Sequence, residues 1–96
     1  MAYVHISRNP GTRLEDYEAI RRAIGDAQIE GQLAHLVGVC DGALQIVDVW
    51  SSKAAADRFA AERLFPAFQS SGIHPSPDAT YTTFDAEVTQ LAGDAQ

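Results

Sequence analysis

The sequence predicts an α+β fold in which two helices cover one face of a four-stranded antiparallel sheet. Apolar and polar residues alternate near both ends of the chain, two apolar runs in the middle flank a tight-turn signal, and two further segments repeat apolar residues every three or four positions. The resulting order, strand–helix–strand–strand–helix–strand, is the βαββαβ order of ferredoxin-like folds. We expect residues 1–96 to form a single domain, since this length suits one domain rather than two.

The first strand and the first helix follow from two short patterns. Residues 2–7 alternate between apolar and polar side chains, as a half-buried strand does. Residues 13–28 show the apolar spacing of an amphipathic helix, and Thr12 and Glu15 before and within it have the spacing of a capping box. Gly31 lies just beyond this helix.

The middle of the chain predicts a β-hairpin. Residues 33–40 and 43–50 are apolar runs, and Asp41-Gly42 between them is a strong signal for a two-residue turn. Such a turn fixes the register of the two strands. On one face we expect the pairs Leu33–Trp50, His35–Asp48, Val37–Ile46 and Val39–Leu44, and on the other Ala34–Val49, Leu36–Val47 and Gly38–Gln45.

The second helix and the last strand complete the order. Ser51 or Ser52 can cap the helix, and Gly72 ends it. Pro66 cannot continue the hydrogen-bond ladder, so we expect a break or kink there. The last strand is predicted at about residues 79–88, where polar and less polar side chains alternate.

Both faces of the predicted hairpin are apolar, although two helices can cover only one face of the sheet. An exposed apolar surface of this extent is unusual on a monomer. We therefore expect a homodimer that forms through the sheet face.

Composition narrows the partners and the compartment. Thirteen acidic and seven basic residues give a formal net charge of −6, which disfavours binding to nucleic acids and to anionic membranes. Cys40 is the only cysteine, so no internal disulfide forms and no multi-cysteine metal site is expected. The first residues lack a signal-peptide pattern, and we expect a cytoplasmic protein.

His35 and Asp48 form the sharpest candidate for chemistry. Directly opposed residues of a hairpin lie close enough for a carboxylate–imidazole hydrogen bond. The carboxylate would fix the imidazole tautomer and leave the other ring nitrogen as a general base, although the same pair could simply stabilise a dimer interface. His5, on the neighbouring first strand, is expected near Ile46 or Asp48. No local ligand motif supports a metal site, so none is predicted.

Aromatic and apolar side chains near this pair are candidates for substrate binding. Trp50, Tyr3 and Tyr81 could form a wall for a planar ligand, with Ile46 and Val37 beside them, or they could pack at an interface instead.

Four other residues receive structural interpretations. Glu62 and Arg63 are predicted on a solvated helix face or in an intersubunit ion pair, and Cys40 as an inert thiol. His74 is predicted in an exposed loop, with a place in a pocket lid as the alternative.

Three segments resemble a known family. Residues 31–38, residues 46–52 and the helix from Phe59 to Pro66, in this order of elements, are similar to the dimeric α/β-barrel superfamily, and within it to small bacterial proteins described as antibiotic-biosynthesis-monooxygenase-like. The resemblance implies a barrel closed between two protomers, with ligand pockets between each sheet and its helices or inside the barrel. It specifies the fold more strongly than the activity, because the superfamily hosts several chemistries.

Within that superfamily, the residues favour a cofactor-free enzyme. The haem-degrading branch requires an asparagine in the first strand and a tryptophan and a histidine on or after the second helix, where this chain has His5 or Ile6, Phe59 and Gln69. Motifs that bind nucleotides or flavins are also absent, so no cofactor is expected.

The leading hypothesis is a cofactor-independent monooxygenase that acts on an aromatic or polyketide-like phenol, with His35 oriented by Asp48 as base and His5 binding a substrate oxygen. The alternatives are a polyketide cyclase or isomerase, which the histidine at position 5 resembles in part, and a ligand-binding homodimer without catalysis.

Overall fold

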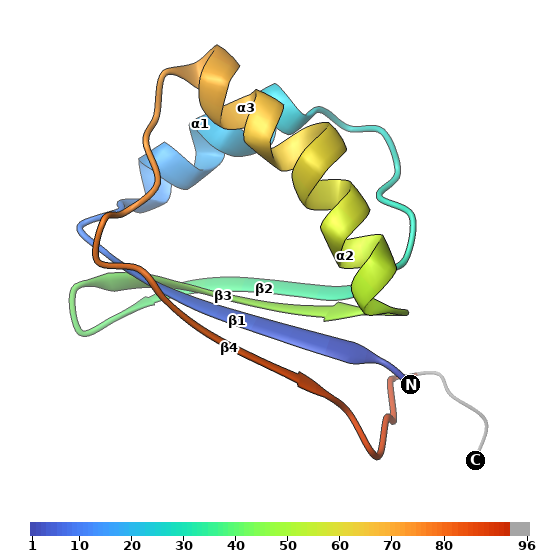
Figure 1. Ribbon diagram of the computed structural model, residues 1–96. Helices are drawn as coiled ribbons and strands as arrows, with labels where there is room; N and C mark the ends of the chain where they lie inside the picture. Colours follow the sequence, from blue (N-terminus) through green and yellow to red (C-terminus); the bar gives the residue numbers. More distant parts are fainter. Residues whose placement is uncertain (93–96) are drawn as a thin grey trace.

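A computed structural model describes residues 1–92 and contains one four-stranded antiparallel sheet with helices on one face (Figure 1). The predicted α+β, ferredoxin-like fold is confirmed, with the strands in the order β2-β3-β1-β4. The elements in chain order are β1 (Tyr3–Pro10), α1 (Leu14–Ile24), β2 (Gln32–Cys40), β3 (Ala43–Trp50), α2 (Lys53–Phe59), the π-helical turn η1 (Ala60–Leu64), α3 (Phe65–Ser71) and β4 (Thr80–Asp85). Within residues 1–92, none of the helices has the length and apolar character needed to span a membrane.

The hairpin forms at the predicted turn. Asp41 and Gly42 have φ angles of 51° and 73°, and positive values at both central residues are typical of the type I′ turn that matches strand twist. His35 lies opposite Asp48 and Val37 lies opposite Ile46, as predicted. His5 lies opposite Asp48 on the other side of β3, so the expected position of the first strand is also confirmed.

The predicted register is wrong at the beginning of β2. Gln32, rather than Leu33, lies opposite Trp50, because a bulge interrupts the ladder between Gln32 and Ala34. A bulge adds one residue to one strand and exchanges which side chain points to each face. Gln32 therefore takes the place on the helix-facing side that the unbroken pattern assigned to Leu33.

Helix α1 is shorter than predicted and begins one residue later than the capping pattern indicated. The backbone N–H of Arg13 donates to the Asp16 carboxylate at 3.0 Å, so the cap involves this pair instead of Thr12 and Glu15. The helix ends at Ile24 instead of near residue 28, because Gly25 leaves the helical conformation with a φ of 87°.

The second helix continues past Pro66. Ser52 caps it by accepting a hydrogen bond from the Ala55 N–H at 3.1 Å, and Gly72 ends it in the left-handed conformation, both as predicted. The break or kink expected at Pro66 takes the form of the turn η1 just before it, where the Phe65 N–H donates to the carbonyl of Ala60, five residues earlier. A wider π-helical turn accommodates a residue that lacks a backbone N–H without ending the helix.

Arg63 connects η1 to the end of α1 and the loop that follows it. Its guanidinium donates to the carbonyl oxygens of Ile24 at 2.9 Å, Ala27 at 3.1 Å and Gln28 at 3.2 Å. Arg63, predicted on a solvated helix face or in an intersubunit ion pair, is half-exposed and is engaged by these three carbonyls of its own chain. A planar guanidinium with five donors is suited to several carbonyls left unpaired where a helix ends.

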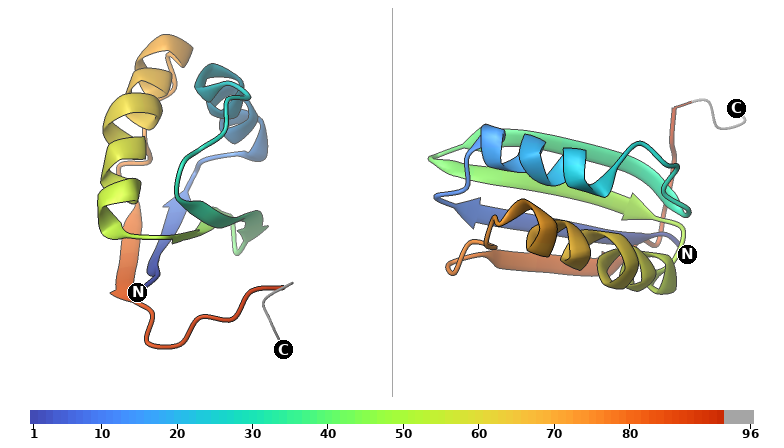
Figure 2. Two further views of the ribbon diagram at one scale, coloured as in Figure 1. Left: turned by 90° about the vertical axis from the view of Figure 1, so that its right-hand side faces the viewer. Right: turned by 90° about the horizontal axis from the view of Figure 1, so that it is seen from above.

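The sheet has one covered face and one face without helices (Figure 2). Residues opposite each other in neighbouring strands point to the same face. The register therefore places the row His35–Asp48–His5–Thr83 on the covered face, and on the other the rows Leu36–Val47–Ile6–Thr82 and Ala34–Val49–Val4–Phe84. We call the second face, defined by those two rows, the open face.

The last strand is shorter than the predicted 79–88, since β4 ends at Asp85. After it, the Ala86 N–H donates to the Ala2 carbonyl at 2.8 Å.

Candidate active site

A cavity of about 750 Å³ lies between the covered face of the sheet and the helices. This volume falls within the range of small-molecule sites in proteins. Both polar and apolar side chains surround it. They include His5, Ser7, Asn9, His35, Ile46 and Asp48 from the sheet, Tyr17, Ile20 and Arg21 from α1, Phe59, Leu64 and Phe68 from the second helix, and His74 and Tyr81 beyond it.

The predicted pair of His35 and Asp48 lies in the wall of this cavity. His35 Nδ1 and an Asp48 carboxylate oxygen are hydrogen-bonded across β2 and β3. The side chains retain 28% and 14% of their exposure, so the pair is partly desolvated but still open to a ligand. In this structure it therefore lies between the sheet and the helices instead of on the open face.

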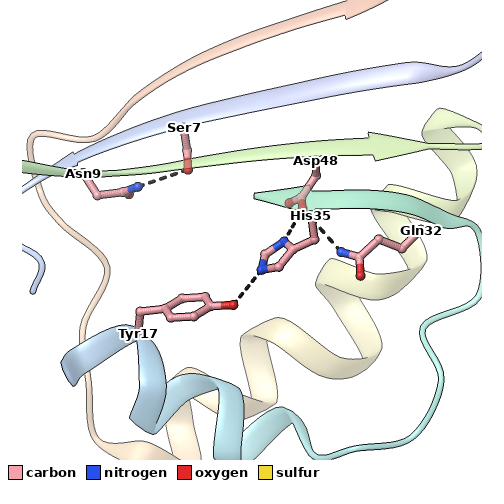
Figure 3. A network of polar contacts seen from close by, with 6 residues as sticks. All are labelled: Ser7, Asn9, Tyr17, Gln32, His35 and Asp48. Atoms are coloured by element: carbon pink, nitrogen blue, oxygen red, sulfur yellow. Dashed lines mark hydrogen bonds and ion pairs between the residues drawn. The ribbon is translucent and has the colours of Figure 1, made fainter. Parts of the chain in front are cut away.

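Tyr17 completes this group and is the site residue that the sequence reasoning missed. Its hydroxyl lies 2.6 Å from His35 Nε2, and the two rings are stacked, with centroids 5.9 Å apart and planes inclined by 25°. Figure 3 shows the chain of contacts that runs from Tyr17 on α1 through His35 to Asp48. Tyr17 belongs to the apolar stripe of α1, and nothing in that spacing indicates which group its hydroxyl contacts.

The hydrogen-bonding capacities of the three groups relate their proton positions to one another. When Asp48 is ionised it only accepts, so His35 Nδ1 carries the proton in that contact. When the ring is also neutral, Nε2 is an acceptor and the Tyr17 hydroxyl donates to it. The ring nitrogen that the sequence interpretation left free is therefore engaged by Tyr17.

The bulge in β2 supports the carboxylate. Gln32 Nε2 donates to Asp48 Oδ1 at 3.3 Å, from the position that the bulge turned toward the helices. Asp48 thus accepts from both Gln32 and His35 through one oxygen. A second donor restricts the carboxylate and hence the imidazole that it orients.

His5 lies in the same row but in a different environment. It is opposite Asp48 in the β1–β3 ladder, and its ring centroid lies 5.6 Å from that of Tyr81, inclined by 52°. Within residues 1–92, no hydrogen bond joins it to Asp48 or His35. His5 and Tyr81 therefore form a second, aromatic part of the cavity wall.

The remaining candidates for substrate binding divide into two groups. Ile46 and Tyr81 line the cavity, as does His74 from the loop after α3. Trp50 is 2% exposed and packs on Phe59 with ring centroids 5.3 Å apart, so it belongs to the core beneath the helix. Tyr3 pairs with Trp50, and Val37 lies beside Ile46 toward the sheet edge; the described cavity lining includes neither of them.

Ser7 and Asn9 add a polar patch at the other end of the cavity. Asn9 Nδ2 donates to Ser7 Oγ at 3.0 Å (Figure 3). It also donates to the Leu44 carbonyl at 3.2 Å. Ser7 is 6% exposed and is the one buried polar residue of the described chain. No feature of the sequence distinguished these two residues from ordinary strand and turn residues.

The described donor side chains do not gather into a metal cluster, and the second helix lacks the histidine expected of a haem-degrading site. No cluster of three or more histidine, cysteine, aspartate or glutamate side chains suited to a metal ion occurs within residues 1–92. The second helix, residues 53–71, carries no histidine, and both ring nitrogens of His35 are engaged by Tyr17 and Asp48. A haem would therefore find no axial histidine on that helix.

No family model matches this chain, and no curated protein is detectably similar to it in sequence. Solved structures do share its fold. A variant of SnoaB, a cofactor-independent oxygenase from Streptomyces nogalater, is 17% identical, with a TM-score of 0.65 over 92% of this chain and 95% of its own. A protein described as an antibiotic biosynthesis monooxygenase is 22% identical, with a TM-score of 0.62 over 90% and 98%.

MhuD, in a structure with two manganese protoporphyrin IX molecules bound per active site, is 18% identical to this chain. Its TM-score is 0.65 over 93% of this chain and 98% of its own. At such identities the similarity establishes the fold. The chain has the ferredoxin-like fold of antibiotic biosynthesis monooxygenase structures, as the resemblance of its segments predicted.

Proposed function

We propose that this protein is a cofactor-independent monooxygenase that acts on an aromatic or polyketide-like phenol in the cavity. His35, oriented by Asp48, is the base that receives the phenolic proton. The electron-rich anion then reacts with dioxygen. The observation that carries the proposal is the histidine–carboxylate pair in the wall of a cavity of about 750 Å³.

The composition of the cavity supports a ring-shaped ligand. Phe59, Phe68 and Tyr81 provide aromatic contacts on the side of the second helix and the sheet edge, and Ile20 and Ile46 face them from α1 and β3. Mostly apolar walls with a few polar groups are typical of sites that bind planar organic molecules. The oxygenase activity stated for SnoaB, which shares the fold, is consistent with this proposal.

Oxygen consumption with a hydroxyarene tests the proposal. With 1,4-dihydroxynaphthalene as probe, the wild-type protein should increase oxygen uptake above the rate of spontaneous oxidation. His35→Gln should remove most of that increase, since a positioned base contributes about 10²-fold or more. Uptake equal to the spontaneous rate, or an unchanged rate in His35→Gln, would contradict it. Conversion of a ligand without oxygen uptake would indicate a cyclase or isomerase, and binding alone a non-catalytic protein.

We also propose that the protein is a homodimer through the open face. Leu36 on β2 and Phe84 on β4 are 62% and 49% exposed, and Val47 and Val49 of the central strand β3 lie between these two edge strands. Within residues 1–92 no helix covers these side chains (Figure 2). A second copy of the same face would bury them, and sedimentation at micromolar concentration should report a mass of two chains.

A further inference from the structure

We infer that Tyr17, rather than His35, is the group that contacts the ligand, and that it relays the ligand's proton to His35. The ligand class that this arrangement recognises is a phenol or enol with an ionisable O–H group. The inference rests on the proposed function and assigns the contact atom within the same cavity.

Both nitrogens of the His35 imidazole are engaged in hydrogen bonds. Asp48 engages Nδ1 and the Tyr17 hydroxyl engages Nε2 at 2.6 Å, so neither nitrogen of His35 is available to a ligand. A ligand that gave its proton directly to His35 would first have to displace Tyr17.

The Tyr17 oxygen remains able to accept a proton. A phenolic hydroxyl that donates its hydrogen still has lone pairs for an incoming donor. Within residues 1–92, the structure shows no second hydrogen-bonding partner for this oxygen, and Tyr17 lines the cavity.

The other titratable side chains around the cavity make no hydrogen bond to Tyr17 or His35 in the described part of the chain. They belong to the strands, to α1 and the loop after it, and to the loop after α3; they are His5, Arg21, Asp26, His74 and Tyr81.

The relay balances as two coupled transfers. The ligand O–H bond breaks and its proton forms a new O–H bond at Tyr17, while the original Tyr17 proton moves to His35 Nε2. The imidazolium that results lies against the Asp48 carboxylate, which stabilises it. The ligand oxyanion is left facing a neutral Tyr17 hydroxyl, which donates to it.

A direct base and a relayed base give opposite predictions for Tyr17→Phe. If His35 acted directly, removing the hydroxyl would free Nε2 and bring it closer to a ligand. If Tyr17 is the relay, the same substitution disconnects the ligand from the base.

The experiment uses hydroxyarenes of one, two and three fused rings, with 2-naphthol as the central probe, and their methyl ethers, which lack the proton. Dissociation constants come from fluorescence titration, and the pH at which the bound hydroxyarene ionises comes from its absorbance. We expect wild-type protein to bind a hydroxyarene about tenfold more tightly than its ether. We also expect the bound hydroxyarene to ionise about one pH unit or more below the free compound.

Tyr17→Phe should reduce the preference for the hydroxyarene to about twofold and remove the shift in ionisation. His35→Gln should retain much of the preference, because the amide can still accept from Tyr17, but should remove the shift in ionisation. Glu18→Gln, one residue away on an exposed position of α1, serves as the matched control and should change neither quantity. Circular dichroism verifies that each variant is folded.

The outcomes separate the two proposals. If the shift in hydroxyarene ionisation persists or increases in Tyr17→Phe, the relay is overturned. The relay is also overturned if this variant keeps the full preference for the hydroxyarene over its ether. Either result leaves the proposal of an aromatic ligand in the cavity intact. Failure of the wild-type protein to bind any of the arenes overturns both. A wild-type preference and ionisation shift that depend on Tyr17, without oxygen uptake, support the relay and contradict the monooxygenase.

Discussion

The two faces of the sheet use the same strands for different purposes. On the covered face, the row His35–Asp48–His5 forms a polar wall of the cavity. The adjacent row, Leu36–Val47–Ile6, is apolar and belongs to the open face. Because strand side chains alternate, a single register fixes both rows. The proposed active site and the proposed dimer interface therefore depend on the same register, although their side chains point in opposite directions.

The largest expected effect distinguishes the two faces directly. Leu36 and Val39 both lie on β2 and are 62% and 61% exposed, but they point to opposite faces. Leu36→Asp places a charge in the proposed dimer interface and should weaken association at least about 10²-fold, because an unpaired charge is costly to bury.

Val39→Asp should leave the dimer intact. Light scattering after size-exclusion chromatography measures both masses. A dimer that survives Leu36→Asp, or that dissociates equally in the two variants, would show that the open face is not the interface.

The second prediction concerns the close packing of Gly31 against α2. Gly31 precedes β2 with a φ of 84°, and a Cβ at this position would lie 2.6 Å from Ala55 Cβ. Gly31→Ala should therefore lower the free energy of unfolding by about 3 kcal/mol, through backbone strain and overpacking.

Gly38→Ala is the matched control, because a Cβ there meets nothing within 4 Å. Urea denaturation of both variants tests the difference. Equal stabilities of the two variants would contradict the close packing of Gly31 against α2.

The third prediction concerns the contribution of Arg63 to stability, through its contacts between η1 and the end of α1. Arg63→Ala leaves the carbonyls of Ile24, Ala27 and Gln28 without this partner and should reduce the free energy of unfolding by about 2 kcal/mol. Arg58→Ala removes an exposed pair with Glu30 at 4.0 Å and should change it by less than about 0.5 kcal/mol. Thermal unfolding that ranks the two variants in the reverse order would contradict this role of Arg63.

The last prediction concerns Gln32, at the bulge of β2, and the rate of oxygen uptake. Gln32→Ala removes the second donor to Asp48 and should reduce the oxygen-uptake rate by about tenfold while leaving the dimer unchanged. Leu33→Ala, the neighbouring bulge residue, should leave the rate unchanged. Equal rates for Gln32→Ala and the wild-type protein would show that His35 alone sets the position of the carboxylate.

The sequence predicted the hairpin well because its turn is local. Asp41-Gly42 requires positive φ angles, and the register from Ala34 to Cys40 follows from it. The prediction failed at Leu33, since the bulge depends on how β2 packs after Gly31, and no pattern of apolar residues shows an inserted position. The His35–Asp48 pairing survived because it lies between the turn and the bulge.

Tyr17 was not predictable by the same means. A tyrosine in an apolar helical stripe has the spacing of a core residue, and its hydroxyl meets His35 because α1 lies above the β2–β3 side of the sheet (Figure 2). The partners of Arg63 were not predictable either. They are carbonyls left unpaired because α1 ends at Ile24, close to η1. Contacts between elements far apart in the chain therefore defined the part of the site that the sequence did not reveal.

The protonation state of His35 shows whether Asp48 and Tyr17 hold the imidazole as a proton acceptor. In protein labelled with ¹⁵N-histidine, we expect His35 to carry its proton on Nδ1 and to have an unprotonated Nε2, and Asp48→Asn to disturb this tautomer. Addition of a hydroxyarene should protonate Nε2 as well, whereas its methyl ether should not. An Nε2-protonated tautomer in the free protein, or an imidazole that bound hydroxyarene leaves unchanged, would contradict the account.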